Sequence, residues 1–482
     1  MLPMEANKEQ VDIPVTATLR DKMKIVLLLA FPAVVENFFQ TFIGFVDVYF
    51  VSKIGLAEVS AIGATNAVLA IYFAVFMAIG VAANVRVANA LGANQVERAR
   101  HIAQQAIILS ILFGILTGIV TLFFARPLLT LMGLEEQVLD IGEDYFRVVG
   151  IPSVFMSLMF ALSANLRGSG NTRAPMKVSI IINIFHALLG YALIFGFWIF
   201  PEMGVTGAAL ATVASRVLGT LLLVYYIQRS EVLAFRKDFW SVDWGHQKEL
   251  ATLGSPAAGE VLIMRAGQIV YFGFIVSLGT NVFAAHQIAG NVEVISYMAG
   301  YGFATAVTIL AGQQIGAGRI EEAISFTKIG AWMAVGIMGV LGLLLFFLGE
   351  WAGSLFSEDP EVISKIGNAL KVSGAFQPFL AALLTLTGAY QAANNTKFPM
   401  YLTAAGMWAI RTVLVYYLGI TLGWGLIGVW IAIGIDIVTR AGVLAYKFAK
   451  GTWMNLEKEA EVESQCHPQS IKETMSDCIN NY

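Results

Sequence analysis

FPAVVENFFQTFIGFVDVYF (residues 31–50) is long and apolar enough to cross a bilayer, yet it carries two carboxylates, Glu36 and Asp47. An ionised carboxylate at the centre of a membrane costs about 3 kcal/mol or more, so it normally faces a protein interior or a watery pathway. We therefore expect the rest of the chain to form the structure in which these two acids are tolerated.

The composition of the chain is that of a polytopic membrane protein. Of its 482 residues, 57% are hydrophobic and only 13% are charged, whereas charged residues make up about a quarter of a soluble domain. The sequence has no basic patch interleaved with aromatic residues, so we expect no nucleic-acid partner. Both cysteines, Cys466 and Cys478, lie near the polar C-terminus, so we expect neither disulfides nor a cysteine-based zinc site to support the fold.

Stretches of about twenty apolar residues can span the hydrocarbon core, and the sequence contains twelve of them. They lie at 25–51, 57–83, 101–124, 145–166, 176–199, 203–227, 249–277, 283–311, 325–349, 366–391, 398–420 and 424–449. The first stretch lacks the pattern of a cleaved leader, so we expect it to be a true span. The fold class predicted is therefore all-α, with an N-lobe at 25–227, a C-lobe at 249–449, a polar loop at 228–248 between them, and polar ends at 1–24 and 450–482.

A single offset of 224 residues relates the two halves. ALGANQVERA (90–99) realigns with QIGAGRIEEA (314–323), and GNTRAPM (170–176) realigns with NNTKFPM (394–400). Two single positions follow the same offset, since Pro32 falls on Pro256 and Glu36 falls on Glu260. Because each half holds six spans, the repeats are expected to share one orientation in the membrane.

The distribution of lysine and arginine predicts the orientation of the chain. If the N-terminus is cytoplasmic, that side collects most of the basic loop residues, whereas the opposite loops hold chiefly Lys53, Arg126 and Lys365. The predicted location is therefore the cell membrane, with both termini cytoplasmic. We expect the polar tail from about Asn455 to lack fixed structure.

No sequence motif indicates a source of chemical energy or a catalytic centre. The dipeptide Gly-Lys does not occur, which excludes a phosphate-binding loop of the G-x-x-x-x-G-K-[ST] kind. HExxH, paired CxxC and GxSxG motifs do not occur either. We therefore expect no enzyme activity and no cofactor, and any uphill work must be driven by an ion gradient.

Ionisable residues inside the spans are the candidates for function. Glu36 and Glu260 occupy equivalent places four residues after a proline, so they can either tie bent helices to the bundle or lie on an ion path. Asp47 has no acidic counterpart, because the repeat places Tyr271 there. An unrepeated acid in a duplicated scaffold favours a role in proton or cation handling.

Other polar groups in the spans allow both a structural and a functional interpretation. His186, which lies near Asn183, can be a hydrogen-bonded structural residue or can titrate in the physiological range. Asp436 and Arg440 have the spacing of an ion pair on one helix. A substrate cleft can be lined by Asn37, Gln40, Gln268 and Gln377, and a second polar site in the C-lobe can be formed by Glu260, Glu293 and Arg265.

Several motifs stand in register along residues 20–450: ALGAN and QIGAG, the two N-T-(R/K)-x-P-M loops, GVTGAALAT (204–212) and FAAHQIAGNVE (283–293). Together they resemble the multidrug and toxic compound extrusion (MATE) family. The resemblance implies two six-helix bundles around a central cleft. It also implies a cation-coupled antiporter that exports amphiphilic, often cationic organic compounds by alternating access, with small molecules and the lipid bilayer as partners. We expect a monomer.

The resemblance further implies a coupling site in the N-lobe. Asp47, fifteen residues after Pro32, matches the acid that the family carries on its first helix, where a proton or Na+ would be exchanged. Thr212 matches a threonine that can neighbour that acid. The other groups expected to contribute to cation coupling are Glu36, His186 and Asn183.

The chain also departs from the patterns of some family members. The acid that several prokaryotic members carry on the fifth helix falls on Gly190, and two acids of the sodium-coupled NorM-like branch fall near Met264 and Phe379. A full sodium site of that branch is therefore not expected, and Na+ at Asp47 is the only metal ion considered. Asp47 with His186 suits a proton better, because carboxylate and imidazole both titrate but do not form a cage of oxygen ligands.

Two other functions remain open from the sequence. A flippase for lipid-linked precursors or polysaccharides, from a related family, would be expected to line its cleft with several basic groups, whereas the central candidates here are mostly acidic. A membrane receptor or scaffold that does not transport would leave the duplication unexplained and predicts no cost when the intramembrane acids are neutralised.

Overall fold

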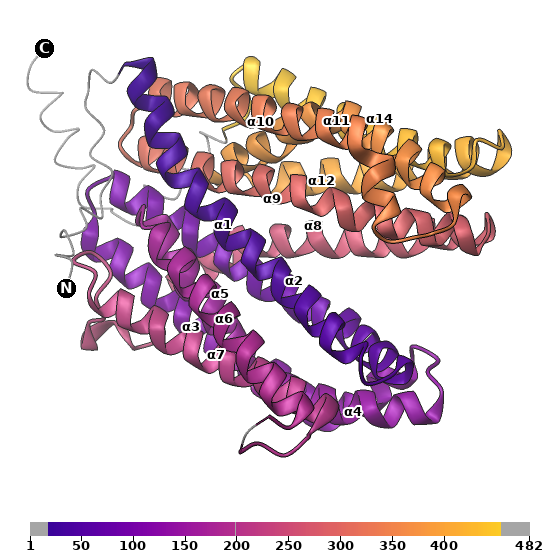
Figure 1. Cartoon of the computed structure of the whole chain (residues 1–482). Coiled ribbons are helices and arrows are strands. Elements are labelled where there is room, and N and C mark those ends of the chain that lie inside the picture. The colour runs from indigo at the N-terminus through magenta and orange to yellow at the C-terminus, as the bar shows by residue number, and fades with distance from the viewer. Residues whose placement is uncertain (1–17, 198, 455–482) are drawn as a thin grey trace, which may run out of the picture.

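The computed structural model describes residues 18–197 and 199–454, so residues 1–17, most of the expected tail, and both cysteines lie outside the described residues. Within those ranges the chain consists of helices and loops, without a strand (Figure 1). The α-helices are α1 (Leu19–Val51), α2 (Leu56–Gly92), α3 (Val96–Thr130), α4 (Glu136–Gly150), α5 (Ser153–Gly168), α6 (Arg173–Phe195), α7 (Gly204–Gln228), α8 (Trp244–Ser277), α9 (Thr280–Gly316), α10 (Ile320–Ser354), α11 (Pro360–Ala392), α12 (Lys397–Ala405), α13 (Thr412–Leu414) and α14 (Gly425–Ala449).

Among the described residues, eleven helical segments are long and apolar enough to cross a membrane. The number reaches the predicted twelve when α4 and α5, which bend by 48° at their break, are counted as one span. The break falls at Pro152, where proline cannot continue the helical hydrogen bonds. The eleventh span, Lys397–Thr421, consists in order of α12, a π-helical stretch at Gly406–Arg411, the short α13 and a second π-helical stretch at Val415–Thr421.

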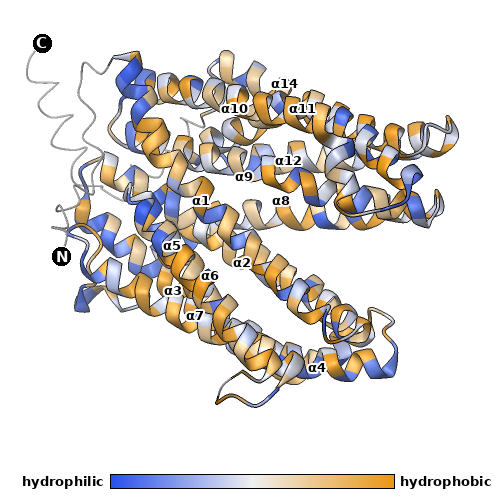
Figure 2. Ribbon diagram, in the orientation of Figure 1, coloured by the Kyte–Doolittle hydropathy of each residue, from blue (hydrophilic) through white to orange (hydrophobic). Residues whose placement is uncertain are grey.

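Several helices are longer than the apolar stretches that predicted them. The first helix begins at Leu19 rather than at residue 25, and α2 continues to Gly92 rather than to residue 83. The apolar stretch marks only the part of a helix within the hydrocarbon core, whereas polar turns extend the same helix beyond it. In Figure 2, hydrophilic residues are concentrated at the end of the molecule that carries the termini.

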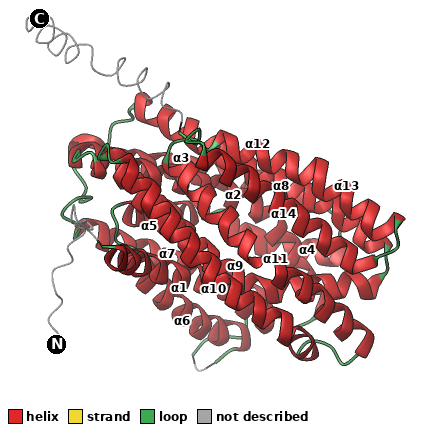
Figure 3. Cartoon of the chain, turned by 90° about the horizontal axis from the view of Figure 1, so that it is seen from above, coloured by secondary structure: helices red, strands yellow, loops and turns green. Residues whose placement is uncertain are grey.

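The helices form two groups, which we call the N-lobe (α1–α7) and the C-lobe (α8–α14). The groups lie together at the end that carries both termini and diverge toward the other end (Figure 1). The view from above shows the same long helices side by side, joined by short loops (Figure 3). The first helix of each lobe begins against the other lobe. Lys22 on α1 forms an ion pair of 2.6 Å with Glu322 on α10, and Gln247 on α8 donates a hydrogen bond of 3.1 Å to the carbonyl of Gln105 on α3.

The sequence repeat is visible in the backbone of the loops. The φ angle is 58° at Asn94 and 71° at its counterpart Gly318, and it is 93° at Gly170 and 58° at its counterpart Asn394. Glycine and asparagine are the residues that adopt this left-handed conformation most readily. This requirement explains why each repeated motif carries Gly or Asn at these positions.

The lobes touch through a symmetric pair of glycines at the end that carries the termini. A side-chain atom on Gly92 of α2 would collide with the backbone of Gln313 on α9, and one on Gly316 of α9 would collide with the backbone of Asn89 on α2. All four positions obey the repeat offset, since Asn89 corresponds to Gln313 and Gly92 to Gly316. Glycine therefore allows the two backbones to approach closely where the lobes meet.

Candidate functional site

The structure brings together Asp47 on α1 and His186 on α6. The Oδ1 atom of Asp47 lies 2.6 Å from Nε2 of His186, a distance typical of a charge-assisted hydrogen bond. The side chains are only 14% and 1% exposed, respectively, so the pair is largely shielded from water. Two ionisable side chains, one from α1 and one from α6, are therefore in direct contact within the N-lobe.

The neighbouring Ser215 of α7 lies near the second ring nitrogen of His186. Its hydroxyl oxygen lies 2.7 Å from the carbonyl of Ala211 and 3.4 Å from Nδ1 of His186. The hydroxyl hydrogen is best used on the nearer carbonyl, which leaves the oxygen as an acceptor for an Nδ1–H group.

Two other predicted residues lie near this pair with different roles. Thr212 lies on α7, one helical turn before Arg216. Its neighbour on α4 is the buried Tyr145, and Tyr145 is also close enough to Asp47 to interact with its charge. Asn183, one turn before His186, donates a hydrogen bond of 2.8 Å to the carbonyl of Ser179, and its buried Oδ1 atom has no hydrogen-bond partner among the described residues.

Glu36 lies elsewhere on α1 and has a different partner. Eleven residues separate it from Asp47, a rise of about 16 Å along a helix. Its Oε1 atom lies 2.6 Å from Nη1 of Arg167 on α5, and Gln40 donates a longer hydrogen bond of 3.4 Å to the same oxygen. Glu36 is only 1% exposed, so its negative charge is balanced by an ion pair in the interior.

A cavity of about 220 Å³ lies at the Glu36–Arg167 pair, between α1, α2 and α5 of the N-lobe and α9 and α11 of the C-lobe. The predicted cleft residues Asn37 and Gln40 line it. Its apolar lining includes Met77, Phe160 and Leu384. The other polar residues that line it are Asn84, Tyr301, Thr305, Thr308, Thr387 and Gln391.

The predicted C-lobe polar residues do not meet in one place. Glu293 accepts hydrogen bonds from Ser373 at 2.5 Å and from Gln377 at 3.2 Å. Glu260 instead accepts a hydrogen bond of 2.8 Å from Thr403 on α12. Arg265 donates a hydrogen bond of 2.9 Å to Gln268 in an exposed contact on α8.

The most strongly paired acid of the C-lobe is Asp436 on α14. It is fully buried and accepts hydrogen bonds of 2.9 Å from Arg411 and from Arg440, which confirms the expected pair on one helix and adds a second arginine. The repeat offset aligns Asp436 with Thr212 and Arg440 with Arg216. Asp47 on α1 and Asp436 on α14 therefore have no acidic counterpart in the opposite lobe, whereas Glu36 on α1 corresponds to Glu260 on α8.

Comparisons with known proteins identify the family. The MatE family model matches residues 32–192 and 256–417, and the two matches begin 224 residues apart, which is the offset of the internal repeat. A relative from Thermotoga maritima, named a probable multidrug resistance protein NorM, is 32% identical over 430 residues, which cover 89% of this chain and 93% of that protein. The chain belongs to the MatE family.

Other members agree with this assignment. The multidrug resistance protein PmpM of Pseudomonas aeruginosa is 26% identical over 440 residues, covering 90% of this chain and 92% of that protein. A solved structure, described as the outward-facing conformation of a multidrug resistance MATE family transporter, superposes with a TM-score of 0.84 at 22% identity and covers 90% of this chain and 97% of that one. The expected resemblance is thus confirmed, and this MatE family member is a membrane transporter rather than an enzyme.

Sequence reasoning missed the partner that neutralises Glu36 in this MatE family member. By sequence, Arg167 is one of the basic residues near the loops of the side expected to be cytoplasmic, whereas the structure shows that it reaches the buried carboxylate from the last turn of α5. Tyr145 and Ser215 were also missed as neighbours of the Asp47–His186 pair. One available signal was that Arg167 has no basic counterpart in the repeat, which places Gln391 there.

Proposed function

We propose that this MatE family member exports amphiphilic, cationic organic compounds in exchange for protons, and that the Asp47–His186 pair is the site of proton exchange. The observation that supports the proposal most strongly is the 2.6 Å contact between an intramembrane carboxylate and an imidazole, both shielded from water. The names of the relatives, which include multidrug resistance proteins, support the substrate class.

The groups around Asp47 favour a proton over Na+. Hard cations such as Na+ prefer a shell of several oxygen ligands, and the carboxylate oxygen here is already engaged by an imidazole nitrogen. Imidazole and carboxylate both change charge by taking up one proton. A proton therefore needs no further ligands at this site.

Alternating access provides the physical link between proton and substrate. In the observed shape the lobes are in contact at one end and diverge toward the other, and the cavity beside Glu36 is lined by residues of both lobes. Binding of a proton at Asp47 changes the charge that a cationic substrate experiences. The proton and the substrate thereby favour different conformations of the transporter. The apolar lining of the cavity suits an amphiphilic substrate.

The test is transport of a cationic fluorescent dye by the purified protein in proteoliposomes, energised separately by a pH gradient and by a Na+ gradient. We predict dye transport with the pH gradient and none with the Na+ gradient alone. The Asp47→Asn variant should lose at least about 10-fold in the gradient-driven rate, because typical couplings between two ligand sites amount to 5–150-fold.

Asp144→Asn provides a matched control, because it makes the same substitution at an exposed position on α4. Its transport rate should equal that of the unmodified protein. The proposal fails if Asp47→Asn retains full proton-driven transport, or if a Na+ gradient alone drives transport as well as a pH gradient does.

A further inference from the structure

The loop between the lobes is hydrogen-bonded to two buried glutamines of α3. Gln104 exchanges two hydrogen bonds of 2.9 Å with the backbone of Arg236. Gln105 donates a hydrogen bond of 2.7 Å to the carbonyl of Ser241 and accepts one of 3.1 Å from the backbone N–H of Asp243. Both glutamines have no exposed surface. The loop therefore has a defined place on the N-lobe just before α8 begins.

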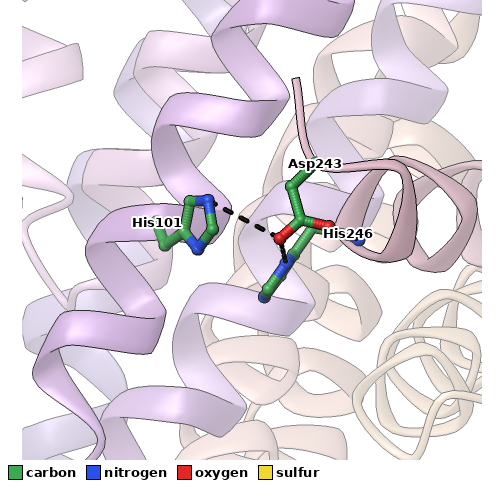
Figure 4. A group of neighbouring side chains, drawn as sticks. All are labelled: His101, Asp243 and His246. Carbon is green, nitrogen blue, oxygen red and sulfur yellow. Dashed lines mark hydrogen bonds and ion pairs between the residues drawn. The ribbon is translucent and has the colours of Figure 1, made fainter. Parts of the chain in front are cut away.

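At this place three potential metal ligands converge: His101 from α3, Asp243 from the loop and His246 from the first turn of α8 (Figure 4). The Oδ2 atom of Asp243 lies 3.0 Å from Nδ1 of His246 and 3.9 Å from Nε2 of His101. One ligand atom from each residue lies within 4.8 Å of the other two. The side chains are 21%, 37% and 22% exposed for His101, Asp243 and His246, so the cluster is accessible from solvent.

We propose that His101, Asp243 and His246 form a binding site for a first-row transition-metal dication such as Zn2+. Two imidazole nitrogens and one carboxylate oxygen are ligands that such ions prefer, and water can complete a tetrahedral site. Metal–ligand bonds of about 2.0–2.2 Å place the ligand atoms of a tetrahedral site about 3.3–3.6 Å apart. This value lies between the two separations from the Asp243 carboxylate, 3.0 Å and 3.9 Å. Mg2+ and Ca2+ fit poorly, because they select oxygen ligands.

The carboxylate of Asp243 is oriented for this role by the start of α8. Its other oxygen, Oδ1, accepts hydrogen bonds from the backbone N–H groups of Gly245 at 2.8 Å and of His246 at 3.3 Å. These bonds cap the helix and leave Oδ2 directed at the two imidazoles. Such fixed outer contacts are typical of metal sites, where they hold the ligands in place.

The internal repeat shows that the scaffold does not require these ligands. The offset aligns His246 with Lys22 and His101 with Ser325. In that half, Lys22 donates a hydrogen bond of 3.0 Å to Ser325 and pairs with Glu322. In the other half of the repeat, a lysine therefore makes the corresponding contact between the lobes. The two histidines occur in one half only.

A metal ion at this site would join α3 of the N-lobe to the start of α8. Because α8 is the first helix of the C-lobe, the ion would hold the two lobes together where α8 begins and would favour the observed shape. This effect on lobe movement rests on the proposed transport function, whereas metal binding itself does not.

The test is calorimetric titration of the purified full chain in detergent with Zn2+. The protein should be purified without a histidine tag, in a background in which Cys466, His467 and Cys478 are replaced by serine, because these tail residues are potential ligands of their own. We expect one Zn2+ per chain. His101→Asn, Asp243→Asn and His246→Asn should each weaken binding by more than about 100-fold, since loss of an outer contact alone typically costs 10–100-fold.

Asp243→Asn retains an oxygen that can cap α8, and Asp238→Asn is the matched control, because it makes the same change at an exposed position of the same loop. Zn2+ affinity should be unchanged in Asp238→Asn. Bound Zn2+ should also protect the loop from trypsin cleavage after Arg236 and Lys237 in the background protein but not in His246→Asn. The proposal is overturned if the three ligand variants bind Zn2+ as tightly as the background, or if Mg2+ binds equally well.

Discussion

At the scale of single residues, the two acids of α1 differ in how their charges are compensated. Glu36 is held by Arg167, a permanent cation, whereas Asp47 is held by His186, a group that can itself gain or lose a proton. The sequence predicted the difference in part, because the repeat matches Glu36 to Glu260 but leaves Asp47 without an acidic counterpart. It did not predict Arg167, because a count of basic residues at span ends does not show how far a long side chain reaches into the interior.

Removal of Arg167 should destabilise the protein, because it leaves the buried carboxylate of Glu36 unpaired. We predict that Arg167→Gln lowers the free energy of unfolding by about 3–5 kcal/mol, the usual penalty for breaking a buried ion pair from one side. Thermal unfolding of the purified protein in detergent measures this change. The double variant Glu36→Gln with Arg167→Gln should recover most of the loss, and an equally unstable double variant would contradict the account.

A double-mutant cycle tests whether Asp47 and His186 act as one unit. We predict that Asp47→Asn and His186→Asn each reduce proton-driven dye transport, and that the double variant is no slower than the slower single variant, because residues in direct contact have non-additive effects. The readout is the initial transport rate at equal amounts of protein in the liposomes. Fully additive losses would show that the two side chains act independently.

At the scale of elements, hydropathy predicted the spans but not their internal breaks. The bend between α4 and α5 and the two π-helical stretches of the eleventh span arise from tertiary contacts and from Pro152, which a count of apolar residues does not register. Arg411 illustrates the point, because it lies in the first π-helical stretch and there reaches Asp436 on α14. The turns were more predictable, since each repeated motif carries Gly or Asn where φ is positive.

The contact between α2 and α9 supplies a prediction for one element. Gly92→Ala should lower the free energy of unfolding by about 1–3 kcal/mol, because the new methyl group overpacks against the backbone of Gln313. Gly63→Ala is the matched control on the same helix, since a side chain there meets open space. It should be neutral or slightly stabilising, as expected for alanine in a helix. Equal effects of the two substitutions in thermal unfolding would argue against a close contact at Gly92.

At the scale of the whole molecule, the duplicated scaffold is symmetric but its polar groups are not. The 224-residue offset predicted the two lobes, and the two matches of the family model follow it. The sequence alone did not show that α1 and α8 each begin against the opposite lobe, because contacts such as Lys22 with Glu322 join residues about 300 positions apart. In the C-lobe, Asp436 is neutralised by two arginines, whereas the proposed exchange site of the N-lobe pairs Asp47 with a histidine.

The most direct test of that proposal is the release of protons when substrate binds. Purified protein in detergent and weak buffer is mixed with a cationic dye, and the pH change and the bound dye are measured together. We predict that the unmodified protein releases about one proton for each dye molecule bound, and that Asp47→Asn releases none. The reason is that the proton and the cationic dye compete for the negatively charged form of the Asp47–His186 pair. Equal proton release in Asp47→Asn and in the unmodified protein would contradict the assignment of Asp47–His186 as the exchange site.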